Sequence, residues 1–286
     1  MKFTKMHGLG NDFIFVAGEA AKLKNPADTA RKLCDRRTGI GADGLVLLLP
    51  SEYADSGMRI YNADGSEAEM CGNALRCAAR YLVERGLARG PVVTIDTRAS
   101  LKKAALLPGG LVRADMGPPI LESTAIPVSG SSRPVIGEEI TAGGARFRYT
   151  AVSMGNPHCV IFLDPGQEAP VITIGPLLER HPNFPKGANI EFCRVLNRGE
   201  VKVAVWERGA GETAACGTGA CAVVVAGVLL GLLERKAAVH LPGGTLQIEW
   251  TAAGPVCMEG PAVTVFEGEM GEGTVPPQID EGGEAL

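Results

Sequence analysis

The sequence lacks the features by which several large classes of protein are recognised. Its net charge at pH 7 is only −4, so it has no strong field for nucleic acid or for an anionic membrane surface. The first residues, MKFTKMHGLGNDF, contain no apolar core of a signal peptide, which argues against secretion. There is no P-loop lysine, and the run GAGETA departs from the dinucleotide-binding pattern at its last position, so no nucleotide cofactor is expected.

The eight cysteines also lack any C-x-x-C pair. Five residues separate Cys71 from Cys77 and four separate Cys216 from Cys221, spacings that do not suit a structural zinc site. A chain of 286 residues needs no disulfide staples, and without a leader it is expected in the reducing cytoplasm. We therefore expect thiols and no metal. Six of the cysteines lie in apolar or helical contexts and are expected to pack in the core: Cys34, Cys77, Cys159, Cys193, Cys221 and Cys257.

Charge is absent from one long stretch, residues 217–233. With seventeen residues it is at the short limit for a membrane span, and it contains four glycines and is followed by Glu234. A helix that is apolar on every face and does not cross a membrane must be surrounded by other structure. The stretch therefore predicts a central helix wrapped by a sheet, and no membrane partner.

The chain contains an internal repeat. Cys216 lies 145 residues after Cys71, and both are followed by glycine. The same offset, without gaps, relates polar residues in separate segments: Gly10-Asn11 to Gly155-Asn156, Gly44 to Asn189, Asn62 to Glu207, and Glu67 to Glu212. Such a constant offset indicates a duplication that produced two similar domains.

The elements expected from periodicity follow the same order in both halves. Helices are expected at 26–37, 72–85, 176–181 and 217–233, and strands at 44–49, 58–62, 92–97, 110–116, 148–155, 159–163, 189–196, 201–207, 238–241 and 246–250. A Pro/Gly/Ser-rich stretch at 117–134 suggests a linker or domain crossover. We expect one domain at 1–117 with a returning strand at about 263–267, a second at 118–262, and a disordered acidic tail at 268–286.

The two Cys-Gly pairs predict a particular chemistry. In each half a strand ends in a polar residue, Asn62 or Glu207, and a loop then leads to a cysteine at the start of a helix. Unpaired N–H groups and the helix dipole at that position favour a thiolate and also a bound carboxylate, so a depressed pKa is expected for these thiols. Inversion of a stereocentre needs one base and one acid on opposite faces. Cys71 and Cys216 from two facing domains fit that requirement.

Five motifs of this chain resemble those of the diaminopimelate epimerase family. The segments are KMHGLGNDF, NADGSEAEMCGNALRC, SMGNPHCV, ERGAGETAACGTGAC and LPGG, and the resemblance covers residues 1 to about 267. The resemblance implies an α+β fold of two pseudo-symmetric domains, each with a mixed or antiparallel barrel-like sheet around a central helix, and an active site in the cleft between them. It also implies a homodimer that interconverts LL- and meso-diaminopimelate without cofactor or metal, in lysine and peptidoglycan precursor synthesis.

The resemblance also implies roles for individual residues. Cys71 and Cys216 would be the acid/base pair, and the ends of the two helices would bind the reacting carboxylate through Gly72-Asn73 and Gly217-Thr218. His158 and Glu207 would adjust the pKa values of the thiols, with Glu207 also at the substrate. The distal end of the substrate would be held by Asn11, Asn62, Asn156, Asn189 and Arg208, with Arg208 facing its carboxylate. One position departs from some relatives, because GIGADG has Gly44 where they have glutamine.

Two other functions are compatible with paired cysteines. A racemase acting on proline or hydroxyproline would use the same two-thiol logic, but a small imino acid has no second charged end for Arg208 to bind. A thiol redox or metal-binding protein is the alternative from a different class. The sequence does not determine which of the two thiols is ionised at rest, because strongly coupled groups titrate as a pair.

Overall fold

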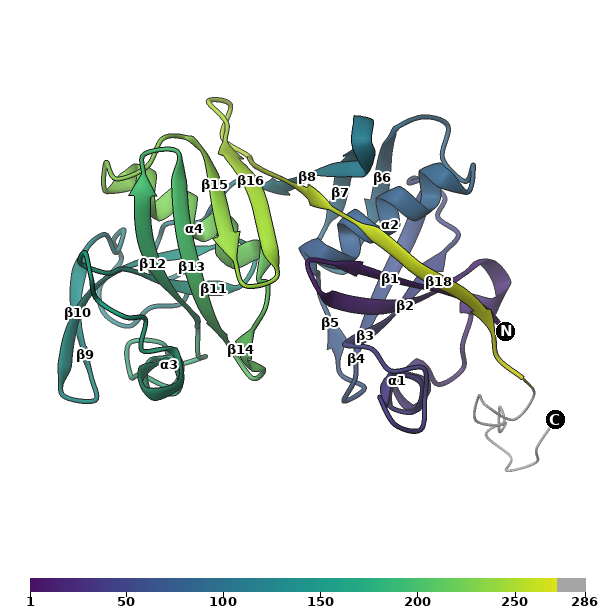
Figure 1. Ribbon diagram of the computed structural model, residues 1–286, viewed down its shortest axis with the longest axis horizontal. Helices are drawn as coiled ribbons and strands as arrows, with labels where there is room; N and C mark the ends of the chain where they lie inside the picture. Colours follow the sequence, from purple (N-terminus) through teal and green to yellow (C-terminus); the bar gives the residue numbers. More distant parts are fainter. Residues whose placement is uncertain (272–286) are drawn as a thin grey trace. The chain divides into compact units, whose positions relative to one another are not determined.

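The computed structural model describes residues 1–271, and the remaining residues, 272–286, lie outside this description. The chain forms two compact units (Figure 1). The first unit comprises residues 1–114 and the chain from Pro261 onward, and the second comprises Asp115–Gly260. The chain therefore enters the second unit once and returns once.

The first unit is a mixed sheet folded around the helix α2 (Figure 1). Its strands pair in the order β18-β1-β2-β3-β4-β6-β7-β8, with the short β5 also on β4. Only β2–β3 and β4–β6 are parallel. The elements are β1 (Lys2–Gly8), β2 (Asn11–Ala17), η1 (Gly18–Ala21), α1 (Pro26–Cys34), β3 (Gly44–Leu49), β4 (Ser56–Asn62), β5 (Glu67–Ala68), α2 (Gly72–Glu84), β6 (Val92–Asp96), β7 (Leu101–Leu106), η2 (Pro108–Gly110), β8 (Leu111–Gly117) and β18 (Val263–Glu269).

The second unit repeats this arrangement around α4. Its strands pair in the order β9-β10-β11-β12-β13-β15-β16-β17, with the short β14 also on β13, and only β11–β12 and β13–β15 are parallel. The elements are β9 (Glu138–Ala142), β10 (Ala145–Ser153), β11 (Pro157–Phe162), α3 (Val171–Glu179), β12 (Asn189–Asn197), β13 (Glu200–Glu207), β14 (Gly211–Thr213), α4 (Gly217–Leu229), β15 (Lys236–Leu241), β16 (Gly244–Trp250) and β17 (Val256–Pro261).

The duplication read from the sequence is present in the fold. Both ends of α3 lie 145 residues after those of α1, and both ends of α4 lie 145 residues after those of α2. The parallel pairs β2–β3 and β4–β6 correspond in the same way to β11–β12 and β13–β15. The predicted α+β fold of two pseudo-symmetric units, each with a sheet around a central helix, is confirmed.

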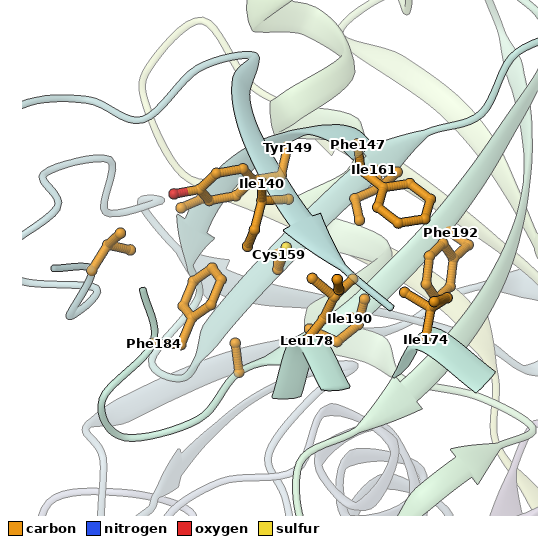
Figure 2. Close-up of a cluster of buried hydrophobic side chains, with 14 of the residues drawn as sticks. Ile140, Phe147, Tyr149, Cys159, Ile161, Ile174, Leu178, Phe184, Ile190 and Phe192 are labelled. Atoms are coloured by element: carbon orange, nitrogen blue, oxygen red, sulfur yellow. The ribbon is translucent and has the colours of Figure 1, made fainter. Parts of the chain in front are cut away.

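The sheet of the second unit has an apolar core on each face, because side chains alternate along a strand. On one face, Ile190 and Phe192 of β12 pack with Ile174 and Leu178 of α3 and with β9–β11 (Figure 2). On the opposite face lies α4, most of whose residues are buried. Glu191 stands between Ile190 and Phe192 and therefore points away from the α3 cluster.

The apolar stretch at 217–233 is thus the enclosed helix that was predicted, although α4 itself ends at Leu229. In residues 1–271, no helix is long and apolar enough to cross a membrane.

Two expected boundaries differ from the structure. The Pro/Gly/Ser-rich stretch at 117–134 is not a free linker, because Ile126 and Val128 are buried in the core of the second unit. The tail was expected to begin at residue 268, but β18 extends to Glu269 and the side chain of Met270 is buried against the α1 side of the first sheet. The rest of the expected tail lies outside the described residues.

Seven strands were not predicted from the sequence: β1, β2, β5, β7, β9, β14 and β17. A second glycine-rich run, GIGADG at 39–44, has the letters G-x-G-x-x-G that GAGETA lacks. It joins the end of α1 to the start of β3, so it leads from a helix into a strand. A dinucleotide-binding turn leads from a strand into a helix, and the run therefore does not form that motif.

A buried ion pair stabilises the first unit. Lys5 is nearly buried, donates to the carbonyl of Gly41, and lies 2.8 Å from the carboxylate of Asp12. Burial alone would raise the pKa of Asp12, but hydrogen bonds from Arg36 and Lys5 hold that pKa well below its usual range. The pair therefore contributes stability at neutral pH that is lost as the pH falls below about 4, where the unfolded carboxyl becomes protonated.

We expect Asp12→Asn to destabilise the protein by about 3 kcal/mol at pH 7, because it leaves the buried Lys5 charge without its counterion. Urea unfolding of the variant at several pH values tests this, and the difference from wild type should shrink as the pH falls. Glu19→Gln is the matched control, because it breaks the exposed Lys22–Glu19 pair and should cost less than about 1 kcal/mol. Equal losses for the two variants would contradict the buried role of Asp12.

Candidate functional site

The two cysteines singled out in the sequence occupy equivalent positions in the two units. Cys71 is the residue immediately before α2 and Cys216 the residue immediately before α4, and both have extended backbone conformations. Each thiol therefore lies at the end of a helix where backbone N–H groups are not used within the helix. Cys71 is partly exposed and Cys216 is buried.

The surroundings of Cys71 are amides. Its Sγ lies 3.7 Å from Oδ1 of Asn11, and the same oxygen accepts a hydrogen bond of 3.1 Å from Nδ2 of Asn73. The amide nitrogen of Asn11 donates to Oδ2 of Asp43 at 2.9 Å. Because a carboxylate only accepts hydrogen bonds, Asp43 fixes the oxygen of Asn11 toward Cys71 and Asn73.

A fully buried arginine supports the start of α2. Arg76 donates to Oδ1 of Asn73 at 2.7 Å and to the carbonyl of Gly72 at 3.3 Å. A Cβ on Gly8 would lie 2.9 Å from its Nη2, so glycine leaves room for the guanidinium. The structure therefore brings together Cys71, Gly72, Asn73 and Asn11.

The first turn of α4 holds Cys216 in a similar way. Its Sγ accepts from the backbone N–H of Gly219 at 3.4 Å and lies 3.5 Å from Oγ1 of Thr218. Asn156 donates from Nδ2 to the same Oγ1 at 3.2 Å. Asn156 and Thr218 thus repeat the pair formed by Asn11 and Asn73 in the first unit, at the offset of 145 residues.

Behind Asn156 lies a buried polar pair, of which His158 was named from the sequence and Glu191 was not. His158 contacts Oδ1 of Asn156 through Nε2 at 3.0 Å and Oε1 of Glu191 through Nδ1 at 2.7 Å. The side chains of His158 and Glu191 are both completely buried. A continuous set of polar contacts therefore runs from Glu191 through His158, Asn156 and Thr218 to Cys216.

The acidity of Cys216 differs from the expectation. Burial raises the pKa of the Cys216 thiol well above its ordinary value, and the negative charges of Glu207 and Glu191 raise it further. The hydrogen bonds from Thr218 and Gly219 act in the opposite direction but do not offset these effects. The depressed pKa predicted from the helix end is thus wrong for Cys216, because desolvation and two carboxylates outweigh the helix dipole.

Glu207 itself is held at the end of β13. Oγ1 of Thr213 donates to its carboxylate at 2.5 Å. Burial raises the pKa of Glu207, while the hydrogen bond from Thr213, the charge of His158 and a hydrogen bond from Cys216 lower it in part. Glu207 is therefore close enough to exchange a hydrogen bond with the thiol, as a residue that adjusts its protonation must be.

Asn189 and Arg208 are connected through the backbone. Oδ1 of the buried Asn189 accepts from the N–H of Arg208 at 2.9 Å, and its Nδ2 donates to the carbonyl of Pro157 at 3.1 Å. The guanidinium of Arg208 donates to the carbonyl of Lys186 at 3.0 Å. Asn189 thus fixes the turn that carries Arg208.

Two other positions named from the sequence lie at the end of β4 and the start of β3. The side chain of Asn62 is exposed and donates to Oγ of Ser66 at 2.9 Å, within its own turn. At Gly44, a Cβ would lie 3.0 Å from the carbonyl of Tyr61, so a longer side chain would need the neighbouring strand to shift. Glycine at position 44, in place of glutamine, therefore allows β3 to pack closely on β4.

Sequence reasoning missed Glu191, Arg76 and Asp43. A signal existed for the first two, because Glu191 is the one charge in the apolar run NIEFC and Arg76 interrupts the run of small and apolar residues in NALRCAA. A charged residue at a buried position must have a polar partner, so such interruptions are candidates for a site. Asp43 stands in a polar loop and has no comparable signal.

We expect Gly219→Ala to destabilise the second unit by about 2 kcal/mol, because its Cβ would lie 2.7 Å from Oε1 of Glu191 and 3.2 Å from Sγ of Cys216. Thermal unfolding measures this. Gly90→Ala is the control, since a Cβ there would meet nothing within 4 Å. An unchanged melting temperature for Gly219→Ala would show that this turn of α4 is not packed as described.

No group of three or more potential metal ligands is present among the described residues.

The family model and the curated relatives agree on one family. The family described as diaminopimelate epimerase matches residues 3–122 and 150–265. A diaminopimelate epimerase from Moorella thermoacetica is 55% identical over 278 residues, covering 94% of this chain and 99% of the relative. One from Methanococcus maripaludis is 50% identical over 275 residues, with coverage of 94% and 99%.

Solved structures share the fold at low identity. A probable proline racemase from Agrobacterium radiobacter superposes with a TM-score of 0.67 at 18% identity, covering 96% of this chain and 94% of that one. A hydroxyproline epimerase from Agrobacterium vitis gives a TM-score of 0.64 at 19% identity, with coverage of 94% and 90%. These structures confirm the fold class.

Proposed function

The chain belongs to the diaminopimelate epimerase family, and we propose that it interconverts LL- and meso-diaminopimelate by proton transfer at the α-carbon. The observation that carries the proposal is the repetition of one thiol setting in both units. Cys71 and Cys216 each precede a central helix by one residue, and the second residue of each helix is hydrogen-bonded to an asparagine, Asn11 or Asn156.

In the proposed reaction the two thiols act on one α-carbon. A thiolate removes the α-proton from one face and becomes a thiol, and the other thiol delivers its proton to the opposite face and becomes a thiolate. In the reverse direction the roles are exchanged. The carbanion between these steps is a much stronger base than a thiolate, so it requires stabilisation by preorganised dipoles. The N-termini of α2 and α4 are such dipoles.

The same helix ends suit the substrate's reacting carboxylate. Gly72-Asn73 and Gly217-Thr218 provide backbone N–H groups there, and glycine allows a close approach. We assign the distal amino-acid end to Asn11, Asn62, Asn156, Asn189 and Arg208, and a further substrate contact to Glu207. Arg208 supplies the positive charge for the distal carboxylate, and its turn is fixed by Asn189.

We also propose that the protein forms a homodimer through β18. Among the described strands this one pairs only with β1, so one of its edges has no partner. Val263, Val265 and Phe266 are exposed on it by 37%, 54% and 46%. An unpaired edge with apolar side chains is a template for association, and a second copy would cover both. Light scattering of wild type and Phe266→Lys tests this.

The proposed chemistry needs both catalytic cysteines reduced, one as a thiolate and the other as a thiol, and neither joined in a disulfide. This requirement favours a reducing compartment such as the cytoplasm. The product and substrate place the reaction in the synthesis of lysine and of peptidoglycan precursors.

Proton NMR of LL-diaminopimelate with the reduced protein in D2O tests the proposal directly. Without added cofactor, we expect the α-proton signal to disappear while the meso isomer appears, because the delivered hydrogen comes from a thiol that exchanges with solvent. Absence of exchange under reducing conditions would remove diaminopimelate as the substrate. L-Proline is the comparison substrate, and exchange with proline alone would indicate a racemase of the related kind.

A further inference from the structure

Glu191 is the most deeply buried carboxylate that the proposed mechanism does not use. Its side chain has no accessible surface, and Oε1 contacts His158 at 2.7 Å. Within the described residues, Oε2 has no hydrogen-bond partner. A buried carboxylate with only one of its oxygens paired is costly for stability, so its presence needs a physical reason.

The position of Glu191 is set by the first turn of α4. A Cβ on Gly219 would lie 2.7 Å from Oε1 of Glu191 and 3.2 Å from Sγ of Cys216, so the carboxylate and the thiol border the same small space. Because residue 219 is glycine, no side chain separates them. His158 reaches Cys216 only through two intervening side chains, those of Asn156 and Thr218. The carboxylate is therefore the nearer member of the buried pair.

The first unit has no equivalent of this pair. At the offset of 145 residues, Glu191 corresponds to Val46 and His158 to Phe13, both buried and apolar. Glu207 corresponds to Asn62, which is exposed. The duplicated fold thus gives the two thiols equivalent backbone settings. At the two positions that carry Glu191 and Glu207 near Cys216 the first unit has no carboxylate, and its own Asp43 reaches Cys71 only through Asn11. Two thiols in such different fields cannot hold their protons equally well.

The groups that act on Cys216 come from three strands and from α4 itself. They are Glu207 of β13, Glu191 of β12, His158 of β11 through Asn156, and the hydroxyl of Thr218 with the N–H of Gly219. The charge of Glu191 also contributes to raising the pKa of two other buried thiols, those of Cys159 and Cys193. Both stay protonated and add no charge near Cys216.

We propose that Glu191 is a positioning residue whose buried carboxylate, held in place by His158, keeps the transferable proton on Cys216 until the substrate takes it. Cys216 is then the acid and Cys71 the base when the resting protein meets the isomer whose α-proton faces Cys71. After that transfer the proton of Cys216 is on the α-carbon and the proton from the substrate is on Cys71. The inference rests on the proposed function only in taking Cys216 as a thiol that exchanges its proton with the substrate.

The titration of the two thiols tests the proposal without any turnover. The reduced full-length protein is labelled with ¹³C at cysteine Cβ, and the chemical shifts of Cys71 and Cys216 are followed against pH in wild type and in Glu191→Gln. Glutamine keeps the shape of the side chain and removes its charge. We expect the midpoint of Cys216 to fall by at least about one pH unit, which is a tenfold larger thiolate fraction at a given pH below it, while Cys71 stays unchanged.

Two further variants keep the test decisive. Glu191→Asp retains the charge and should leave Cys216 close to its wild-type midpoint. If Glu191→Gln does not fold, the wild type is compared with Glu191→Asp instead. Glu138 lies on β9 and pairs with Arg133, and Glu138→Gln should shift the titration midpoint of neither thiol. A merely structural Glu191 would lower the melting temperature and shift neither titration.

The outcomes also separate this inference from the proposed function. An unchanged or higher midpoint of Cys216 in Glu191→Gln would overturn the role of Glu191, whether or not the protein epimerises diaminopimelate. If Glu191→Gln lowers the midpoint of Cys216 but the wild-type protein shows no exchange with diaminopimelate, the role of Glu191 is supported and diaminopimelate is removed as the substrate.

Discussion

Replacement of either Cys71 or Cys216 by alanine is expected to lower kcat for epimerisation by about a thousandfold or more. A positioned acid or base contributes roughly 10²–10⁴ in rate, and inversion uses one of each. Alanine removes the only atom that can carry the proton on that face, and the remaining thiol cannot reach the opposite face of the same α-carbon. Both variants should remain folded, because Cys71 is partly exposed and the loss of one buried sulfur at Cys216 is a small cavity.

Solvent exchange makes this prediction sharper than an activity assay. In D2O, each single variant should still exchange the α-proton of the isomer that faces the remaining thiol, with retention of configuration, and should not exchange the other isomer. Cys257→Ala is the control, because Cys257 lies on β17, distant in sequence from both helix starts, and should epimerise normally. Normal epimerisation by Cys71→Ala or by Cys216→Ala would show that the two-thiol mechanism is wrong.

Replacement of Arg208 by leucine is expected to raise KM for diaminopimelate by about a hundredfold. Hydrogen bonds to charged groups contribute about 1.5–3 kcal/mol, and Arg208 is the assigned partner of the distal carboxylate. Its turn is held in place, because Asn189 accepts from its N–H and because Gly187, whose φ is +70°, has no side chain: a Cβ there would lie 3.0 Å from Cδ of Arg208. The guanidinium is thus presented at a defined place, and leucine should lose the charge with little change in the fold.

Steady-state kinetics of three variants separate charge from geometry. Arg208→Lys keeps the charge without the planar fork and should give an intermediate KM. Arg146→Leu, which removes an exposed arginine on β10, should behave like wild type. A fall in kcat with an unchanged KM for Arg208→Leu would place the guanidinium at the reacting carbon and not at the distal end.

The direction of the Cys216 pKa shows where reasoning from local sequence ends. The Cys-Gly pattern located both thiols at the starts of helices, and the structure places them there. A helix dipole is a local property, so its presence follows from the pattern. Burial and the charges of Glu191 on β12 and of Glu207 at the end of β13 are set by tertiary packing, and their sum exceeds the local effect.

The sequence alone determined the duplication, the enclosed helix and the two thiol positions. Each depends on patterns within one segment or on a constant offset between segments: the Cys-Gly pairs, the uncharged stretch at 217–233 and the spacing of 145 residues. The family likewise followed from motifs of contiguous residues, and its fold came with it.

Only the tertiary structure decided what surrounds each thiol. The parallel pairing of β11 with β12 sets His158 beside Asn189, and the side-chain alternation of β12 turns Glu191 toward α4. Asp43 reaches Asn11 from another segment, and Arg76 fits because Gly8 has no side chain. These contacts depend on strand register and on close packing between distant residues. Neither strand register nor long-range packing can be predicted from a single segment. Together they give two equivalent cysteines different chemical surroundings.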